Sequence, residues 1–253
     1  MFEDIYDKKV LITGSSSGIG FEISKSFAER NCQVVINGRN EKKLKNASKK
    51  IEGALTVAGN AENPLGAKKI VTKTIKLLKG LDILICNVGS GSSVKPGLEN
   101  YKYWKKSLEK NFFSATNVIE ESKKYLVRSK GVIICISSIC GLEYIEGAPT
   151  TYSVAKAALN SYVKMTSKVL GKSGVRINAI APGNIMFRDS VWYKKMKKNK
   201  EKTKKFIKSK VPLNKFGNPK NVADMSLFLS SDASNFVTGS VWAVDGGQIN
   251  RII

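Results

Sequence analysis

The stretch "KVLITGSSSGIG", residues 9–20, decides the fold. A short apolar run of strand length leads into a loop with three glycines, and a helical pattern begins before the loop has ended. Gly14 permits a tight turn, Gly18 lets the backbone approach a phosphate, and Gly20 allows a helix to pack closely against a strand. The exposed amides at the start of such a helix favour an anion. The stretch therefore predicts a strand–turn–helix unit that binds a phosphate group.

The rest of the chain repeats this alternation of strands and helices. Strands are expected at 9–13, 33–37, 54–57, 82–86, 131–137, 176–180 and 240–244, and helices near 19–30, 41–51, 65–79, 100–128, 151–171 and 219–230. Continuous β-branched runs indicate strands buried on both faces, and their alternation with helices indicates a parallel sheet covered on both sides. No repeat or composition break divides the chain. We therefore expect one doubly wound α/β domain over residues 1–253, with helices on both faces of a sheet of about seven strands.

The composition excludes several kinds of chemistry. The 253 residues contain no histidine, which rules out Ser–His and Cys–His nucleophile pairs and His-ligated metal sites. Cys32, Cys86, Cys135 and Cys140 lack the spacing of a zinc or redox motif, so we interpret them as buried free thiols in a reducing compartment and expect no metal site. General acid–base chemistry at neutral pH must therefore use Tyr, Lys, Cys, Asp or Glu with a shifted pKa.

The formal charge of +23 is compatible with a nucleic-acid, membrane or anionic small-molecule partner. Because the 37 lysines are scattered over most predicted helices and arginines number only 6, we favour generic surface charge over a dedicated polyanion site. The amino terminus does not have the pattern of a signal peptide, and the longest apolar runs are far shorter than the roughly 20 residues of a membrane span. We expect a cytoplasmic protein with neither a nucleic-acid nor a membrane partner.

One lysine-dense segment, 186–211, interrupts the alternation. It follows the predicted sixth strand, at the carboxyl edge of the sheet where ligands bind in folds of this kind. We expect either a lid over a pocket for an anionic substrate or a solvated surface insertion. The length of the segment suits either role.

Six short motifs and one single residue stand out along the chain. They are "TGSSSGIG" (13–20), "CNVG" (86–89), Asn111, "ISSICG" (136–141), "YSVAK" (152–156), "NAIAPGNI" (178–185) and "VDGG" (244–247). With these motifs the chain resembles the short-chain dehydrogenase/reductase family over almost its whole length, in particular its 3-oxoacyl-[acyl-carrier-protein] reductase branch. The resemblance implies a Rossmann-type fold, a nicotinamide cofactor, and a dimer or tetramer formed through the helices at 100–128 and 151–171.

The resemblance also implies roles for individual residues. The catalytic residues would be Asn111, Ser138, Tyr152 and Lys156, and the cofactor-binding residues Gly14, Ser16, Ser17, Gly18, Ile19, Gly20, Arg39, Asn60, Ala61, Asn87, Gly89, Tyr152, Lys156, Pro182, Gly183 and Ile185. Tyr152 would protonate the carbonyl oxygen while hydride arrives from the cofactor, and Ser138 would orient that oxygen. Lys156 would bind the nicotinamide ribose, and Asn111 would hold a water in a proton relay.

The spacing of Tyr152 and Lys156 has a physical meaning of its own. Two other Tyr/Lys pairs have the same spacing, at 101/105 and 193/197, but only this one lies 14 residues after Ser138 and opens a predicted helix. An ordinary tyrosine has a pKa of about 10. A lysine ammonium about 5 Å away would stabilise the phenolate by roughly 3 kcal/mol at an effective dielectric near 20. We therefore expect Lys156 to lower the pKa of Tyr152 by about two units.

The end of the second predicted strand bears on the choice of cofactor. NAD-preferring members of the family tend to carry Asp near the position of Gly38, whereas here Gly38 is followed by Arg39. A guanidinium suits a 2′-phosphate, and no acid is expected to oppose it. The alternative is a turn-forming Asn-Gly with a solvated Arg. We predict a preference for NADP(H) over NAD(H).

Three positions depart from the family's pattern. Asn60 stands where Asp is usual against the adenine, and can still hydrogen-bond. Val88 replaces a smaller alanine and would crowd the cofactor. Phe187 stands where a threonine often binds the carboxamide, so one nicotinamide contact is expected to be lost.

The function expected on these grounds is an NADP(H)-dependent oxidoreductase that interconverts a ketone and a secondary alcohol. Its small-molecule substrate would be anionic, such as a 3-oxoacyl thioester or a sugar derivative. One alternative is a cofactor-binding regulator without turnover. The other is a basic nucleic-acid-binding protein, which would need a contiguous lysine face and a steep dependence of affinity on salt.

Overall fold

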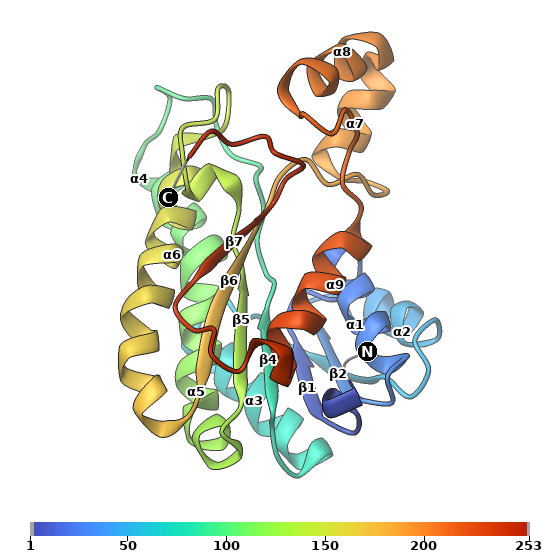
Figure 1. The fold of residues 1–253 in the computed structure, drawn as a ribbon, viewed down its shortest axis with the longest axis vertical. Coiled ribbons are helices and arrows are strands. Elements are labelled where there is room, and N and C mark those ends of the chain that lie inside the picture. The colour runs from blue at the N-terminus through green and yellow to red at the C-terminus, as the bar shows by residue number, and fades with distance from the viewer. Residues whose placement is uncertain (1–2, 252–253) are drawn as a thin grey trace.

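The computed structural model of the chain, which describes residues 3–251, is built around one parallel sheet (Figure 1). Its seven strands lie in the order β3-β2-β1-β4-β5-β6-β7. They are β1 (Lys9–Ile12), β2 (Gln33–Gly38), β3 (Leu55–Ala58), β4 (Ile83–Cys86), β5 (Val132–Ile136), β6 (Arg176–Pro182) and β7 (Val241–Val244). All seven expected strands are therefore confirmed, with ends that differ from the expected ones by two residues or fewer. The doubly wound α/β fold is confirmed as well.

The direction in which strands are added reverses at β1. The chain adds β2 and β3 on one side of β1, then crosses to place β4 on the other side with Leu11 opposite Leu84. In folds of this kind the crevice at the carboxyl ends of the strands, next to this reversal, is where ligands bind. The glycine loop that follows β1 lies at that crevice.

Helices cover the sheet on both faces (Figure 1). One face packs against α1 (Gly18–Ala28), α2 (Glu41–Ser48) and α9 (Pro219–Ser230), through side chains such as Phe27, Leu44 and Leu227. The other face packs against α3 (Pro64–Leu78), α5 (Ser114–Ser129) and α6 (Thr150–Leu170), through Ile70, Val118 and Leu159. The central strands β1, β4 and β5 are almost wholly inaccessible to solvent, as their continuous β-branched sequences predict.

The single helix expected at 100–128 is interrupted. α4 (Tyr101–Leu108) and α5 are joined by a π-helical segment, Glu109–Phe113, with Asn111 at its centre. Such wide turns insert one residue into a helix and occur frequently at functional sites. The hydrophobic pattern runs on through the segment, so the sequence did not indicate the break.

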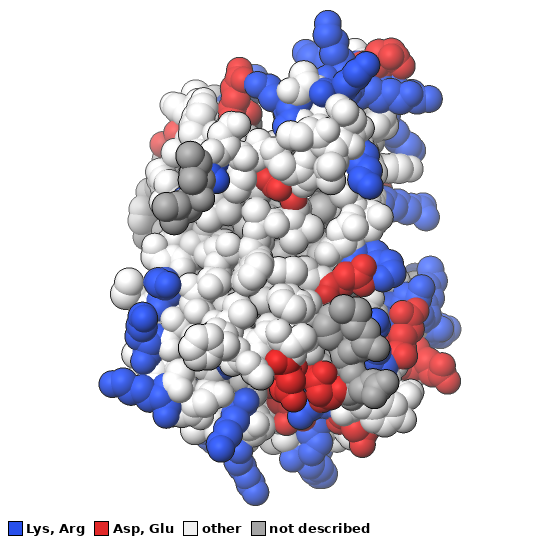
Figure 2. All heavy atoms as spheres, viewed as in Figure 1, with Lys and Arg blue, Asp and Glu red and all other residues white. Residues whose placement is uncertain are grey.

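The lysine-dense segment forms two further helices above the carboxyl edge of the sheet, α7 (Val191–Lys198) and α8 (Lys200–Lys210). Asn199 ends α7 and caps α8 by accepting a hydrogen bond from Lys202 N. The Trp192 and Phe206 rings stack with their centroids 5.2 Å apart and hold the two helices together. Figure 2 shows lysine side chains projecting outward from this pair of helices.

The cysteines are free thiols, as expected, but they are not all buried. Cys32, Cys86 and Cys135 are buried, whereas Cys140 is partly exposed. Cys140 follows β5 and faces the crevice, where side chains must leave room for a ligand. Within residues 3–251, no helix combines the length and the hydropathy needed to cross a membrane.

Candidate active site

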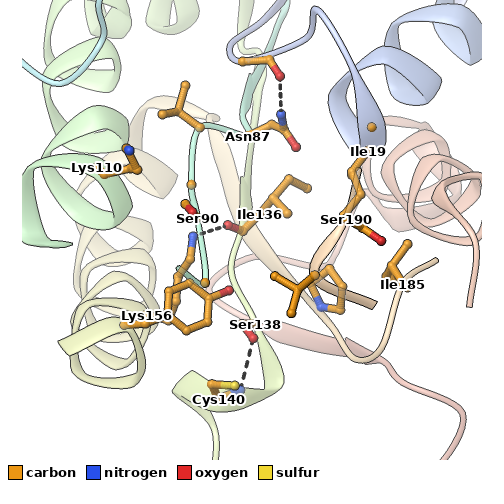
Figure 3. Close-up of a pocket in the computed structure, with 18 of the residues that line it drawn as sticks. Ile19, Asn87, Ser90, Lys110, Ile136, Ser138, Cys140, Lys156, Ile185 and Ser190 are labelled. Carbon is orange, nitrogen blue, oxygen red and sulfur yellow. Dashed lines mark hydrogen bonds between the residues drawn. The ribbon is translucent and has the colours of Figure 1, made fainter. Parts of the chain in front are cut away.

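A cavity of about 880 Å³ opens along the carboxyl ends of the strands (Figure 3). Most of the residues predicted to bind a cofactor or to catalyse line it. They are Gly14, Ser16, Ser17, Gly18, Ile19, Arg39, Asn60, Ala61, Asn87, Gly89, Ser138, Tyr152, Lys156, Pro182, Gly183 and Ile185. Two predicted residues, Gly20 and Asn111, do not line it, and their surroundings explain why.

Gly20 is a packing residue. A Cβ there would lie 2.4 Å from Asn87 Nδ2 and 2.9 Å from Gly14 O, so only glycine fits at this point. Asn87 Nδ2 in turn donates to Thr13 O and Gly14 O, both at 3.0 Å. These contacts lock the turn that follows β1 onto the turn that follows β4.

The first turn of α1 is suited to an anion. Ser17, its N-cap residue, makes no side-chain capping hydrogen bond. By contrast, α2, α3, α4, α7, α8 and α9 all begin with an Asn or Ser whose side chain accepts a backbone N–H. The amide groups of a helix start attract negative charge. An uncapped helix start that opens into a cavity therefore fits a phosphate group.

Phe187 lies against the glycine loop. A Cβ on Gly18 would be 2.6 Å from Phe187 Cε2, so the ring packs directly on the glycine backbone. The backbone of this segment is held by Met186 N, which donates to Gly217 O at 2.8 Å, and by Ser190 N, which donates to Phe187 O at 3.0 Å. The ring thus fills space beside the helix start where the sequence suggested close approach of a phosphate.

The expectation that no acid opposes Arg39 is wrong. Arg39 Nη1 lies 3.2 Å from Glu62 Oε1, and both residues line the cavity at the end formed by β2 and β3. Gly38 and Ala58 are paired in the sheet, so the turns that follow them run side by side. Because Glu62 is 23 residues from Arg39 in the chain, local sequence did not reveal the contact.

Ser138, Tyr152 and Lys156 meet at the opposite end of the cavity. Ser138 follows β5, and its Oγ accepts a hydrogen bond from Cys140 N at 3.2 Å while interacting with the Tyr152 hydroxyl. Tyr152 lies in the first turn of α6 and Lys156 one turn later. Lys156 Nζ donates to Ile136 O at 2.8 Å (Figure 3). It lies 6.0 Å from the centre of the Tyr152 ring.

The expected lowering of the Tyr152 pKa is not found in this structure. Burial raises the pKa of Tyr152 to about 12, and the Ser138 hydrogen bond offsets only part of that effect. Burial also lowers the pKa of Lys156 to about 8. Lys156 is buried and Tyr152 is partly buried, and loss of water disfavours the charged form of each group. Tyr152 is therefore protonated at neutral pH, which suits a proton donor.

Asn111 holds the active-site backbone together. Its Oδ1 accepts from Ser90 N at 2.8 Å, and its Nδ2 donates to Ser107 O at 3.1 Å. A Cβ on Gly89 would lie 3.1 Å from Asn111 Oδ1 and 3.2 Å from Lys156 Nζ, so both polar atoms lie next to the Gly89 backbone. Asn111 lines a smaller pocket of about 270 Å³, which it shares with Lys110.

Several lining residues were not identified from the sequence as individual site residues. Trp192, Lys195 and Phe206 come from α7 and α8 and line the side of the cavity formed by these two helices. Lys195 Nζ lies 4.4 Å from the centre of the Trp192 ring, so its position is fixed by an aromatic face. Lys110 also lines the cavity and is adjacent in the chain to Asn111, which could have drawn attention to it.

Comparison with known proteins matches most of the chain. The family model described as Enoyl-(Acyl carrier protein) reductase matches residues 14–248. The 3-oxoacyl-[acyl-carrier-protein] reductase FabG of Chlamydia muridarum is 31% identical over 251 residues, covering 96% of this chain and 98% of that protein. The protein of the same name from Thermotoga maritima is 30% identical over 247 residues, with 96% and 98% covered.

A solved structure shares the fold closely. It is the L-sorbose reductase of Gluconobacter frateurii, complexed with NADPH and L-sorbose. It superimposes with a TM-score of 0.92 at 29% identity and covers 100% of both chains.

Proposed function

The chain belongs to the short-chain dehydrogenase/reductase family, and from this premise we propose that it is an NADP(H)-dependent oxidoreductase that interconverts a ketone and a secondary alcohol. The observation that carries the proposal is one cavity with two chemically different ends. Ser138, Tyr152 and Lys156 converge at one end, and the glycine loop with Arg39 lies at the other. A small carbonyl compound would fit at the first end and a dinucleotide phosphate at the second.

The residues fit a phosphorylated dinucleotide. The uncapped start of α1 would hold the pyrophosphate, and Arg39 would bind the 2′-phosphate through charge-assisted hydrogen bonds. Lys156 donates one hydrogen bond to Ile136 O, and its other N–H groups would bind ribose hydroxyls. The NADPH complex of the similar L-sorbose reductase supports the same cofactor here.

The bound nicotinamide would supply the hydride that reduces the carbonyl carbon. Tyr152 donates its hydroxyl proton to the carbonyl oxygen, since a pKa of about 12 keeps that proton in place at neutral pH. Ser138, whose Oγ is fixed by Cys140 N, orients the same oxygen. The phenolate that forms recovers its proton from solvent on the side of Lys156 and Asn111, and the ammonium of Lys156 stabilises it meanwhile.

We propose that the substrate is a small anionic carbonyl compound, either a 3-oxoacyl thioester or a sugar derivative. Lys110 and Lys195 place cations at the cavity wall. The FabG relatives are named for a 3-oxoacyl thioester, and the L-sorbose reductase complex holds a ketosugar. In this proposal α7 and α8 act as a lid over the substrate end, as their lining residues support.

The test is consumption of NADPH, followed by its absorbance, with a panel of acetoacetyl thioesters, ketosugars and simple diketones. We expect turnover on at least one carbonyl, a slower rate with NADH, and loss of turnover in Tyr152→Phe. If NADPH binds but no carbonyl is reduced, a regulatory role without turnover replaces this proposal.

We further propose that the protein is a cytoplasmic homodimer or homotetramer. The outer surface of α6 exposes Val154, Met165 and Val169, the last two to more than 60%, and an apolar surface of this kind suits a subunit contact. Light scattering should give a mass at least twice that of the chain, and a monomer would contradict the assembly.

A further inference from the structure

The ion pair between Arg39 and Glu62 has no role in the function proposed so far. It joins the end of β2 to the turn after β3, and both partners line the cavity. The Arg39 side chain is 61% exposed, whereas that of Glu62 is only 17% exposed. The pair therefore combines a solvated, movable cation with a carboxylate that the protein holds in place.

The backbone around Glu62 explains its fixed position. Glu62 N donates to Asn60 Oδ1 at 3.2 Å, and Asn63 caps α3 by accepting from Gly66 N at 2.8 Å. A Cβ on Gly66 would meet Asn60 O at 1.9 Å, so this turn is closely packed. Arg39, by contrast, follows the last residue of β2. Its side chain makes no other hydrogen bond to residues 3–251.

The same end of the cavity carries no acid on β2. Gly38 has no side chain, and a Cβ there would lie 3.4 Å from Ser16 Oγ. The only carboxylate among the residues that line this end is Glu62, on the neighbouring turn. One cation and one anion thus face a ligand there: the cation attracts a phosphate dianion, and the carboxylate, already paired with that cation, competes with the phosphate for it.

We propose that Glu62 is a cofactor-selectivity residue, an inference that rests on the proposed function. Glu62 holds Arg39 in an ion pair that a 2′-phosphate must compete with, and so limits the preference for NADP(H) over NAD(H). The selectivity of the protein is then set by the pair, not by Arg39 alone. Removing the Glu62 charge frees the guanidinium for the phosphate.

The test is direct binding, which does not depend on a substrate. Dissociation constants are measured by calorimetry for NADPH and NADH, and for the fragments adenosine 2′,5′-bisphosphate and AMP, which differ only in the 2′-phosphate. Glu62→Gln should raise the ratio of affinities for the phosphorylated over the unphosphorylated ligand by about fivefold, the scale of one exposed ion pair. Arg39→Gln should lower that ratio by at least as much.

Two further variants separate this mechanism from a general charge effect. In the Arg39→Gln background, Glu62→Gln should change the ratio by less than about twofold, because there is no guanidinium left to free. Glu29→Gln is the matched control, since it removes a carboxylate from the exposed Lys25–Glu29 pair outside the cavity, and it should leave the ratio unchanged.

An unchanged or lowered ratio in Glu62→Gln would overturn the inference, and so would an equal effect of Glu62→Gln with and without Arg39. These outcomes leave the proposed function intact as long as the wild type binds a nicotinamide dinucleotide. If the wild type binds neither NADPH nor NADH, the proposed function itself fails.

Discussion

The ammonium of Lys156 lies 6.0 Å from the centre of the Tyr152 ring and donates its hydrogen bond to the carbonyl of Ile136. The lysine is therefore anchored to the end of β5, beside the phenol but not bonded to it. Loss of water raises the pKa of Tyr152 and lowers that of Lys156, so the tyrosine remains a neutral acid at neutral pH and the lysine loses its proton more readily than an ordinary lysine.

Tyr152→Phe should reduce turnover by about 10²- to 10⁴-fold, the usual contribution of a positioned general acid. The ring is retained, so packing in α6 is preserved and the dissociation constant for NADPH should change by less than about threefold. Steady-state rates with a carbonyl substrate, together with calorimetric binding of NADPH, measure the two effects separately. Turnover close to that of the wild type would remove Tyr152 from the mechanism.

Lys156 should make the stability of the protein depend on pH in a defined window. The unfolded chain holds this proton up to about pH 10.5, while burial lowers the pKa in the folded state to about 8. Between these values the unfolded state binds more protons, so the free energy of unfolding rises with pH. The charged form of Lys156 thus lowers the free energy of unfolding below pH 8, and this effect disappears as the pH rises towards 10.5.

Comparison with Lys156→Met isolates this effect from the other lysines. Between pH 8 and pH 10, the wild type should gain about 2 to 3 kcal/mol relative to the variant, because each pKa unit corresponds to about 1.4 kcal/mol. Urea unfolding at several pH values gives the difference. A difference that does not vary with pH would show that Lys156 has an ordinary pKa in the folded protein.

Gly20 and Gly171 form a matched pair for testing the packing of the glycine loop. A Cβ on Gly20 would lie 2.4 Å from Asn87 Nδ2, whereas a Cβ on Gly171 meets nothing within 4 Å. Gly20→Ala should lower the free energy of unfolding by about 1 to 3 kcal/mol through overpacking and should weaken NADPH binding. Gly171→Ala should be neutral or slightly stabilising. Equal effects in the two variants would contradict the packing role of Gly20.

The fold could be predicted because its determinants are local. Runs such as "VIICI", short and rich in β-branched residues, are typical of buried strands, and glycines at fixed intervals mark the first turn. The resemblance to the family, by contrast, predicted that Ser138, Tyr152 and Lys156 act together, and all three line one cavity in the structure.

The features that were missed depend on contacts between distant parts of the chain. The Arg39–Glu62 pair joins two turns, and the raised pKa of Tyr152 depends on how completely the surrounding chain excludes water. The π-helical segment at Asn111 leaves the hydrophobic pattern unbroken. None of these has a signal in residue type or spacing, so only the three-dimensional arrangement reveals them.

Phe187 should hinder cofactor binding in the wild type. Its ring packs on Gly18 at the uncapped start of α1 and so occupies part of the space in front of the amide groups that face the cavity. A phosphate that binds there must displace part of the ring, which costs the apolar contacts that the ring makes with the core cluster around α1.

Phe187→Thr should therefore strengthen NADPH binding by about three- to tenfold, a range that corresponds to about 1 kcal/mol. Threonine removes the ring and adds a hydroxyl that can hydrogen-bond the cofactor. Phe187→Leu is the control, because it keeps an apolar side chain and adds no polar group; it should give a smaller gain. Fluorescence titration of NADPH measures the affinities, and thermal unfolding without cofactor should show a loss of stability in both variants. Weaker NADPH binding in both would mean that the ring supports the bound cofactor and does not obstruct it.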